Sequence, residues 1–106
     1  MKFVLTLYRD PPWDDRDHEE FLTAAREAGE LVGVLVPADP STSAVVRVRG
    51  GVTTVTDGPY LDTGDQAGAH YLLDCDDRDR AVELAGLLPA RAVEVRPLMG
   101  AAGMEM

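Results

Sequence analysis

Four side chains able to bind anions or transfer protons fall on one predicted face of a β-sheet: Tyr8, His70, Glu94 and Arg96. Imidazole and phenol groups can act as acids or bases, and a guanidinium binds a carboxylate through paired hydrogen bonds. The set predicts a site for an anionic aromatic or carboxylated molecule, with Arg96 as its clamp and His70 or Tyr8 as the acid–base group. A plainer interpretation also fits: Glu94 and Arg96 form a structural ion pair, and His70 is a hydrogen-bonded interface residue.

A second group of candidates surrounds the turn Asp57-Gly58-Pro59-Tyr60. Pro59 fixes its own φ and moves Gly58 out of the helical region, so the turn is tightly specified. Alternation places Asp57 on the apolar face of the preceding strand, where a carboxylate needs a partner, a turn amide or a catalytic role. Asp57 therefore either caps its own turn or takes part in catalysis. Tyr60 is a candidate substrate contact, and Trp13 is either a packing residue or a cover for a bound ring.

Length and charge limit the classes of protein that fit. A chain of 106 residues predicts one domain, placed at residues 1–98, and a flexible tail at 99–106. The net charge of -9 argues against a nucleic acid or an anionic membrane as the main partner. Cys75 is the only cysteine, so an internal disulfide is excluded, and its apolar strand predicts a buried, inert thiol. The N-terminal apolar run is too short for a signal peptide, which indicates a cytoplasmic protein.

The elements that must position these residues alternate between strands and helices. Residues 3–8, 31–36, 68–75 and 92–96 are predicted strands, and Gly50-Gly51 joins two more, 44–49 and 52–57, in a hairpin. A first helix, capped by Asp14 or Asp15, runs to about Ala28, and Gly29 is its expected C′ residue. A second helix follows a cap at Asp76 or Asp77 and ends before Pro89.

This order predicts an α+β fold: a ferredoxin-like β-α-β-(β-hairpin)-β-α-β subunit. Both helices are expected on one sheet face, whose residues are Phe3, Leu5, Leu7, Tyr71, Leu73, Val93 and Val95. The opposite face is mixed and takes Thr6, Tyr8, His70, Leu72, Glu94 and Arg96. Because that face is partly apolar, we expect a second copy of the chain to cover it in a homodimer.

Several segments together resemble the YCII-related (DGPF-domain) family. The turn Asp57–Tyr60 resembles its D-G-P-F signature, residues 46–48 its T-V-R segment, 68–71 its G-G-Y-Y strand and 93–97 its V-E-V-R-P ending. The resemblance covers nearly the whole chain and implies a dimeric α+β barrel of ferredoxin-like subunits. One departure is the run 62–65, which has no basic residue where the family commonly has E-T-K-E. No role of that lysine can therefore be transferred to this chain.

The resemblance also implies a His–Asp dyad. The YCII branch has R-x-x-H on its first helix and an Asp after its second strand. Here Arg16-Asp17-His18 and Asp39 occupy similar places, with the arginine one position out of register. In such a dyad the carboxylate would fix the imidazole tautomer and support its charged form. The alternative is a surface histidine in an acidic helical turn, with Asp39 as a turn residue.

These observations predict a small cofactor-free enzyme that moves protons on an organic acid or aromatic metabolite, by isomerisation, elimination or cyclisation. No metal and no nucleotide cofactor are expected, because histidine pairs at ligand spacing and a glycine-rich phosphate loop are missing from the sequence. The alternative is a non-catalytic ligand-binding or regulatory module linked to transcription, since similar domains occur joined to sigma-factor-like regulators. A structural dimer without a ligand is a third possibility.

Overall fold

The computed structural model describes residues 1–8, 18–61 and 67–100. Trp13, the predicted caps Asp14 and Asp15, the run 62–65 and residues 101–106 lie outside this part. The chain has two compact units, Met1–Val36 with Ala67–Met106, and Pro37–Gln66. In chain order the elements are β1 (Lys2–Tyr8), α1 (Glu19–Glu27), β2 (Leu31–Leu35), a 3-10 helix (Pro40–Thr42), β3 (Ala44–Arg49), β4 (Val52–Asp57), β5 (Ala67–Asp74), α2 (Arg78–Ala85) and β6 (Ala92–Pro97).

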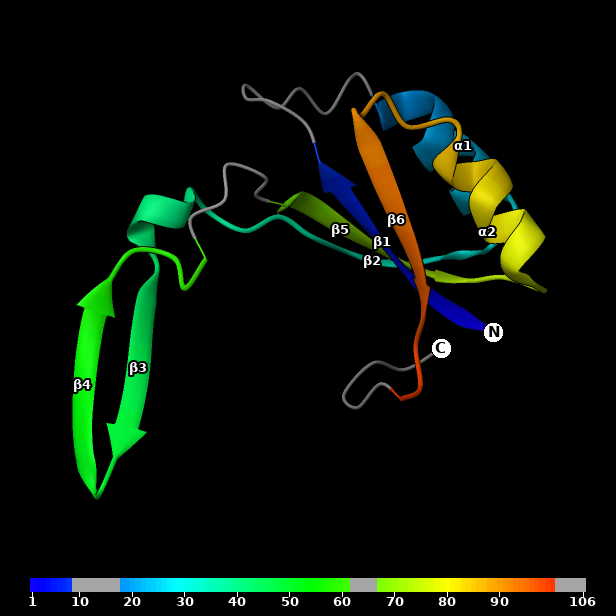
Figure 1. Ribbon diagram of the computed structural model, residues 1–106. Coiled ribbons are helices and arrows are strands. Elements are labelled where there is room, and N and C mark those ends of the chain that lie inside the picture. The colour runs from blue at the N-terminus through cyan, green and yellow to red at the C-terminus, as the bar shows by residue number, and fades with distance from the viewer. Residues whose placement is uncertain (9–17, 62–66, 101–106) are drawn as a thin grey trace. The chain divides into compact units, whose positions relative to one another are not determined.

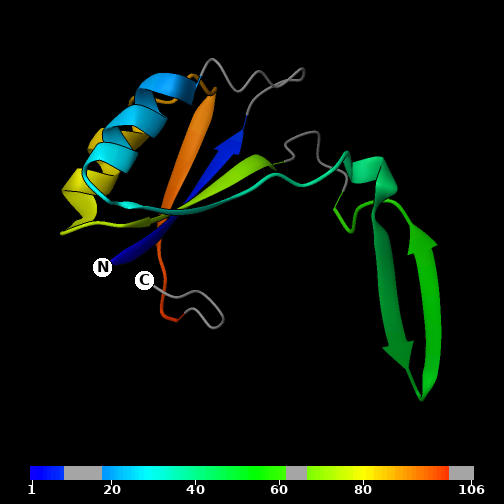
Figure 2. The same ribbon diagram turned by 180° about the vertical axis from the view of Figure 1, so that it is seen from behind.

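The first unit contains a four-stranded sheet in the order β2-β5-β1-β6, and every neighbouring pair is antiparallel. Helices α1 and α2 lie side by side on one face of this sheet (Figures 1 and 2). The α+β class and the element order predicted from the sequence are thus confirmed. Among the described residues, neither helix has the length and apolar character needed to cross a membrane.

The core lies between the sheet and the two helices. Its fully buried members come from alternate positions of the strands and from one stripe of each helix, namely Phe3, Leu5, Leu7, Leu73, Phe21, Ala25, Ala81 and Leu84. Val93 and Val95 are partly buried and pack against this cluster. Burying a leucine or phenylalanine side chain contributes about 1.5–3 kcal/mol, so this face dominates the folding energy. The predicted helix-covered face is confirmed.

The ends of the helices follow from local sequence. Helix α1 has His18 at its N-cap position and ends where Gly29 takes a φ of 69°. There Gly29 N donates to Arg26 O at 3.0 Å and Glu30 N to Ala25 O at 2.8 Å, the bond pattern of a Schellman motif. At the start of α2 the side chain of Asp77 accepts from Arg80 N at 2.9 Å. The C′ glycine and one of the two proposed caps of α2 are thereby confirmed.

The second unit is built around the hairpin of β3 and β4. The strands pair from Ala44 opposite Asp57 to Arg49 opposite Val52. Gly50 and Gly51 have φ values of 55° and 79°, which glycine adopts without strain. After β4, Gly58 also has a positive φ, 102°, and its N–H donates to Ser43 O at 2.7 Å. The predicted hairpin is thus confirmed, and the chain bends at Gly58 directly after it.

Candidate functional site

His70 lies on the sheet face that the helices leave uncovered. The strand register places Leu35, His70, Thr6 and Glu94 in one row across β2, β5, β1 and β6. His70 is half-buried, and its Nδ1 lies 3.1 Å from Thr6 Oγ1. A hydroxyl can donate to or accept from an imidazole nitrogen, so this bond orients the ring and leaves Nε2 as the other proton-transfer position. Sequence alternation put Thr6 on this face without identifying it as the partner of His70.

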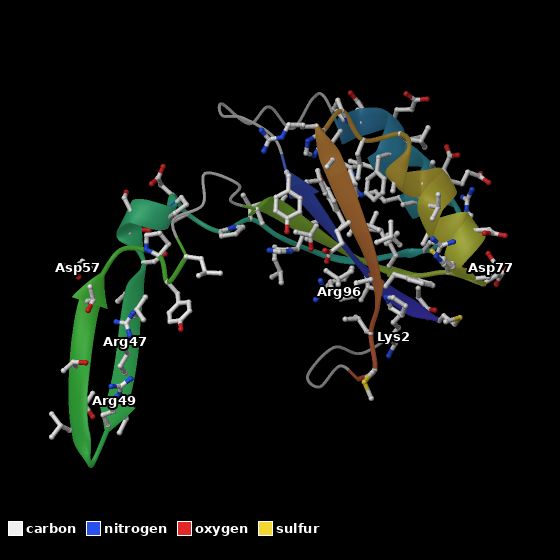
Figure 3. The ribbon with its side chains drawn as sticks, viewed as in Figure 1. Lys2, Arg47, Arg49, Asp57, Asp77 and Arg96 are labelled. Carbon is white, nitrogen blue, oxygen red and sulfur yellow. The ribbon has the colours of Figure 1, made fainter. Side chains whose placement is uncertain are left out.

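Glu94 and Arg96 form an ion pair along β6 on the same face, with Arg96 Nη2 at 2.6 Å from Glu94 Oε1. Their side chains are 43% and 67% exposed. An exposed pair contributes about 0–1 kcal/mol, so a ligand carboxylate can compete for the guanidinium at little cost. Figure 3 shows Arg96 on the sheet away from the helices. Half-buried Tyr8 lies two residues from Thr6 along β1, on the same side of the strand.

His18 belongs to the opposite, helix-covered side. It is 3% exposed, and its Nδ1 is hydrogen-bonded to the hydroxyl of Tyr71 on β5. The two rings meet edge-on with centroids 5.7 Å apart, and Phe21 packs on Tyr71 at 4.6 Å. The alternative of a surface histidine is therefore wrong, because the side chain lies in the core. Sequence analysis placed Tyr71 on the covered face, and only the fold shows that it meets His18.

Asp39 acts as a local cap in the second unit. Its carboxylate accepts from Ser41 N at 2.9 Å at the start of the 3-10 helix, and Thr42 Oγ1 donates to its carbonyl at 2.7 Å. The hydrogen bonds from Ser41 hold the pKa of this exposed carboxyl below its usual 3.8. These contacts fit the interpretation of Asp39 as a turn residue. The His18–Asp39 dyad stays a prediction.

The residues of the Asp57–Tyr60 turn are exposed or half-buried. Asp57 is exposed at the end of β4, and the bond from Gly58 N to Ser43 O continues the pairing of the two hairpin strands by one residue. Tyr60 is 70% exposed, and the guanidinium carbon of Arg47 lies 5.5 Å from the centroid of its ring. A cation over an aromatic face is attractive, so this contact orients Tyr60 beside β3.

A polar cluster that sequence analysis missed lies where α1, β5 and α2 meet. Glu30, only 9% exposed, accepts from Arg80 Nε at 3.0 and 3.1 Å and from Arg80 Nη2 at 2.8 Å. These bonds lower the pKa of Glu30, and burial together with this carboxylate raises the pKa of the Cys75 thiol to about 11. A hollow of about 410 Å³ adjoins the pair, lined by Ala28, Glu30, Asp74, Asp76, Asp77 and Arg80. The only signal for this pair in the sequence is a glutamate directly after the helix-ending glycine.

Within residues 1–8, 18–61 and 67–100, no three side chains of His, Cys, Asp or Glu gather closely enough to hold a metal ion. The polar groups of the helix-free face include a hydroxyl–imidazole pair and an ion pair. Such a set can bind an anion and transfer a proton without further groups.

Two comparisons relate this chain to known proteins, and one of them names a family. The model of the YCII-related domain matches residues 1–99 of this chain. The protein named Uncharacterized protein R00369, from Rhizobium meliloti (strain 1021), is 39% identical over 79 residues. That alignment covers 68% of this chain and 62% of the relative, so the chain spans less than two thirds of the relative's length. With a family match over nearly the whole sequence, the chain belongs to the YCII-related domain family.

Proposed function

We propose that the protein binds a small organic acid on the helix-free face of its sheet and moves a proton on it, through isomerisation, elimination or cyclisation. His70 is the proton-transfer group and Arg96 binds the carboxylate. The observation that carries the proposal is the hydrogen bond between His70 Nδ1 and Thr6 Oγ1 on the sheet face opposite α1 and α2. An oriented imidazole with one nitrogen still available is what general acid–base catalysis needs.

The position of Arg96 supports the binding of an acid. Thr6 is opposite Glu94, and Val4 is opposite Arg96, so the guanidinium belongs to the row next to His70. A ligand carboxylate on Arg96 would take over the place of Glu94 in a pair that is open to solvent. Tyr8 lies on the other side of the His70 row. Its phenol can contact the ring of the ligand or take part in a second proton transfer.

The proposal includes a homodimer in which a second copy covers this face. The face combines apolar Val4, Leu35 and Leu72 with the polar row of His70 and Thr6, a mixture that suits an interface enclosing a partly polar space. Removing bulk water from such a space would strengthen the electrostatic interactions of the ligand with Arg96 and His70. Of the two histidines we choose His70, since His18 is 97% withdrawn from solvent within the described chain.

The test uses proton exchange in D2O. Benzoate, phenylacetate and succinate would be incubated with the protein, and NMR would follow binding at the His70 ring and the loss of carbon-bound protons of phenylacetate and succinate. We expect shifts at His70 on binding, and exchange above the buffer rate for an acid with a proton next to its carboxylate.

Two variants and a control sharpen this test. His70→Asn keeps a group that can hydrogen-bond Thr6 but removes Nε2, so it should abolish exchange while binding persists. Arg96→Gln should weaken binding about tenfold or more, since it removes a charge-assisted hydrogen bond. Arg26→Gln, on the exposed side of α1, is the matched control and should change neither. Binding without exchange would favour the non-catalytic module, and no shift at His70 with any acid would contradict the site.

A further inference from the structure

The helix-free sheet face carries a cation that the proposed function does not use. Lys2, at the start of β1, is half-buried and is the only lysine of the chain. Alternation along β1 places it on the same side as Val4 and Thr6, and therefore on the face of His70 and Arg96. Figure 3 shows Lys2 and Arg96 on the side of the sheet away from the helices. Two cations thus lie on one sheet face of a chain whose net charge is -9.

The strand register fixes the place of Lys2 relative to Arg96. Arg96 is opposite Val4, which is opposite Leu72, and Lys2 lies two residues before Val4. Leu98 N donates to Lys2 O at 2.9 Å, so the segment that carries Arg96 continues past Lys2. Two residues along a strand span about 7 Å, a distance that two long side chains can bridge. Between the two cations the face is apolar, because Val4 and Leu72 form its floor there.

The acidic side chains nearest to these cations have other partners. Asp74 is opposite Lys2 in the register, but its Oδ1 lies 3.3 Å from the N-terminal ammonium group. Glu94 is paired with Arg96. Among residues 1–8, 18–61 and 67–100, no ion pair includes the ammonium group of Lys2. Its three N–H donors are therefore available to an anionic group of a ligand.

We propose that Lys2 and Arg96 bind the two carboxylates of one dicarboxylic acid. Arg96 takes the carboxylate nearer to His70, because its guanidinium already pairs with Glu94, which lies in the row of His70. The ammonium group of Lys2 takes the other carboxylate, and the carbon chain between them lies over the apolar floor. A phosphate monoester suits the site less well, because both of its charges are on one group.

This inference rests on the proposed function, because it adds a second anchor to the acid that Arg96 binds. It does not depend on proton transfer at His70. The two can be distinguished by experiment. A protein that binds acids with one and with two carboxylates equally well contradicts the inference alone, whereas a protein that binds neither contradicts both.

The first experiment measures affinities by calorimetry for succinate, glutarate and their monomethyl esters, which have one charge less. We expect the wild type to bind at least one diacid about fivefold or more tightly than its ester. Lys2→Met keeps the unbranched apolar stem, and should reduce this preference to about twofold or less without changing the affinity for the ester. Lys2→Arg keeps the charge and should keep the preference, as should the control Arg26→Gln. An unchanged preference in Lys2→Met, or tighter binding of ethyl phosphate than of either diacid, would overturn the inference.

The second experiment observes Lys2 directly. Because the chain has one lysine, reductive methylation with carbon-13 formaldehyde labels only this side chain and the N-terminal amine, and methylation keeps the positive charge. The signal that is missing from Lys2→Met belongs to Lys2. We expect the diacid that binds to shift this signal and its monomethyl ester to leave it in place. A Lys2 signal that ignores the bound diacid, or that moves equally with the ester, would overturn the inference.

Discussion

At the scale of single residues, the structure assigns partners that sequence spacing leaves open. In the sequence, His18 and His70 are both candidates for proton transfer. In the structure, His18 is hydrogen-bonded to Tyr71 in the core, whereas His70 is hydrogen-bonded to Thr6 on the uncovered face. Alternation along β1 and β5 was enough to put His70 on that face. It could not put His18 in the core, because the position of a helix N-cap depends on how the helix packs on the sheet.

Glu30 makes stability depend on pH in a defined direction. Its folded-state pKa lies below the ordinary 4.5 because of the Arg80 hydrogen bonds. Its contribution is therefore present above about pH 4.5 and is lost as pH falls through the folded-state pKa. We expect urea unfolding of the wild type to show a fall in unfolding free energy below about pH 4.5 that Glu30→Gln reduces. An unchanged pH profile in Glu30→Gln would contradict this.

The partner of Glu30 offers a companion measurement at neutral pH. Arg80→Leu leaves the largely buried Glu30 carboxylate unpaired, and should lower the unfolding free energy by about 2–3 kcal/mol. This is less than for a fully buried pair, since the Arg80 side chain is 30% exposed. Arg78→Leu, an exposed position on the same helix, is the control and should cost much less. A similar loss in both variants would mean that the pair is not the cause.

Cys75 should react very slowly in the folded protein. The side chain is 4% exposed, and its pKa is raised from 9.0 to about 11. Near neutral pH this shift alone lowers the thiolate fraction about a hundredfold. We expect alkylation by iodoacetamide to be at least about that much slower in buffer than in urea, as mass spectrometry would show. Rates within a few-fold of each other would contradict the burial of the thiol.

At the scale of elements, most of the fold could be predicted from the sequence. Alternating apolar residues identified the strands, and Gly29 and Gly50-Gly51 marked a helix end and a hairpin, because few other residues adopt positive φ. The start of α1 was harder to predict. Acidic residues are dense in that region, and several of them could serve as a cap.

Substitutions at Gly50 and Gly51 should act on hairpin stability through the positive φ of these positions and not through steric clashes. A Cβ at Gly50 or Gly51 would meet nothing within 4 Å, so any cost comes from the positive φ. Gly51→Val should weaken the hairpin by about 1–2 kcal/mol, whereas Gly50→Asn should be nearly neutral. Cross-strand NMR contacts between Val46 and Val55 report the hairpin population. Equal loss of these contacts in both variants would count against the turn geometry.

At the scale of the whole molecule, the sequence predicted the strands and helices but not the division of the chain into two compact units, and the expected homodimer stays a prediction. An interface depends on the fit of two surfaces, whereas the alternation of apolar and polar residues in one chain shows only which of its faces are apolar. The helix-free sheet face is visible in this way through Val4 and Leu72, and one face of the hairpin through Val46 and Val48.

Hydrogen exchange should separate the two units. Strands β1 and β5 are central in the sheet, and their apolar core residues are buried, so their amides should exchange most slowly. Amides of β3 and β4 should exchange faster, because a two-stranded hairpin with exposed valines is at best marginally stable in water. Mass spectrometry of deuterium uptake measures this. Hairpin amides as strongly protected as those of β1 and β5 would contradict this expectation.

The residue after Gly29 has a consequence for how this chain can vary. Glu30 uses its N–H to close α1 on Ala25, its carbonyl to accept from Asp74 N at 2.8 Å at the end of β5, and its carboxylate to hold Arg80 on α2. Glu30 thus fixes the positions of α1, β5 and α2 relative to one another. Insertion or deletion of a single amino acid between α1 and β2 would break all three links together. We therefore expect relatives to vary the length of this connection far less than that of other loops.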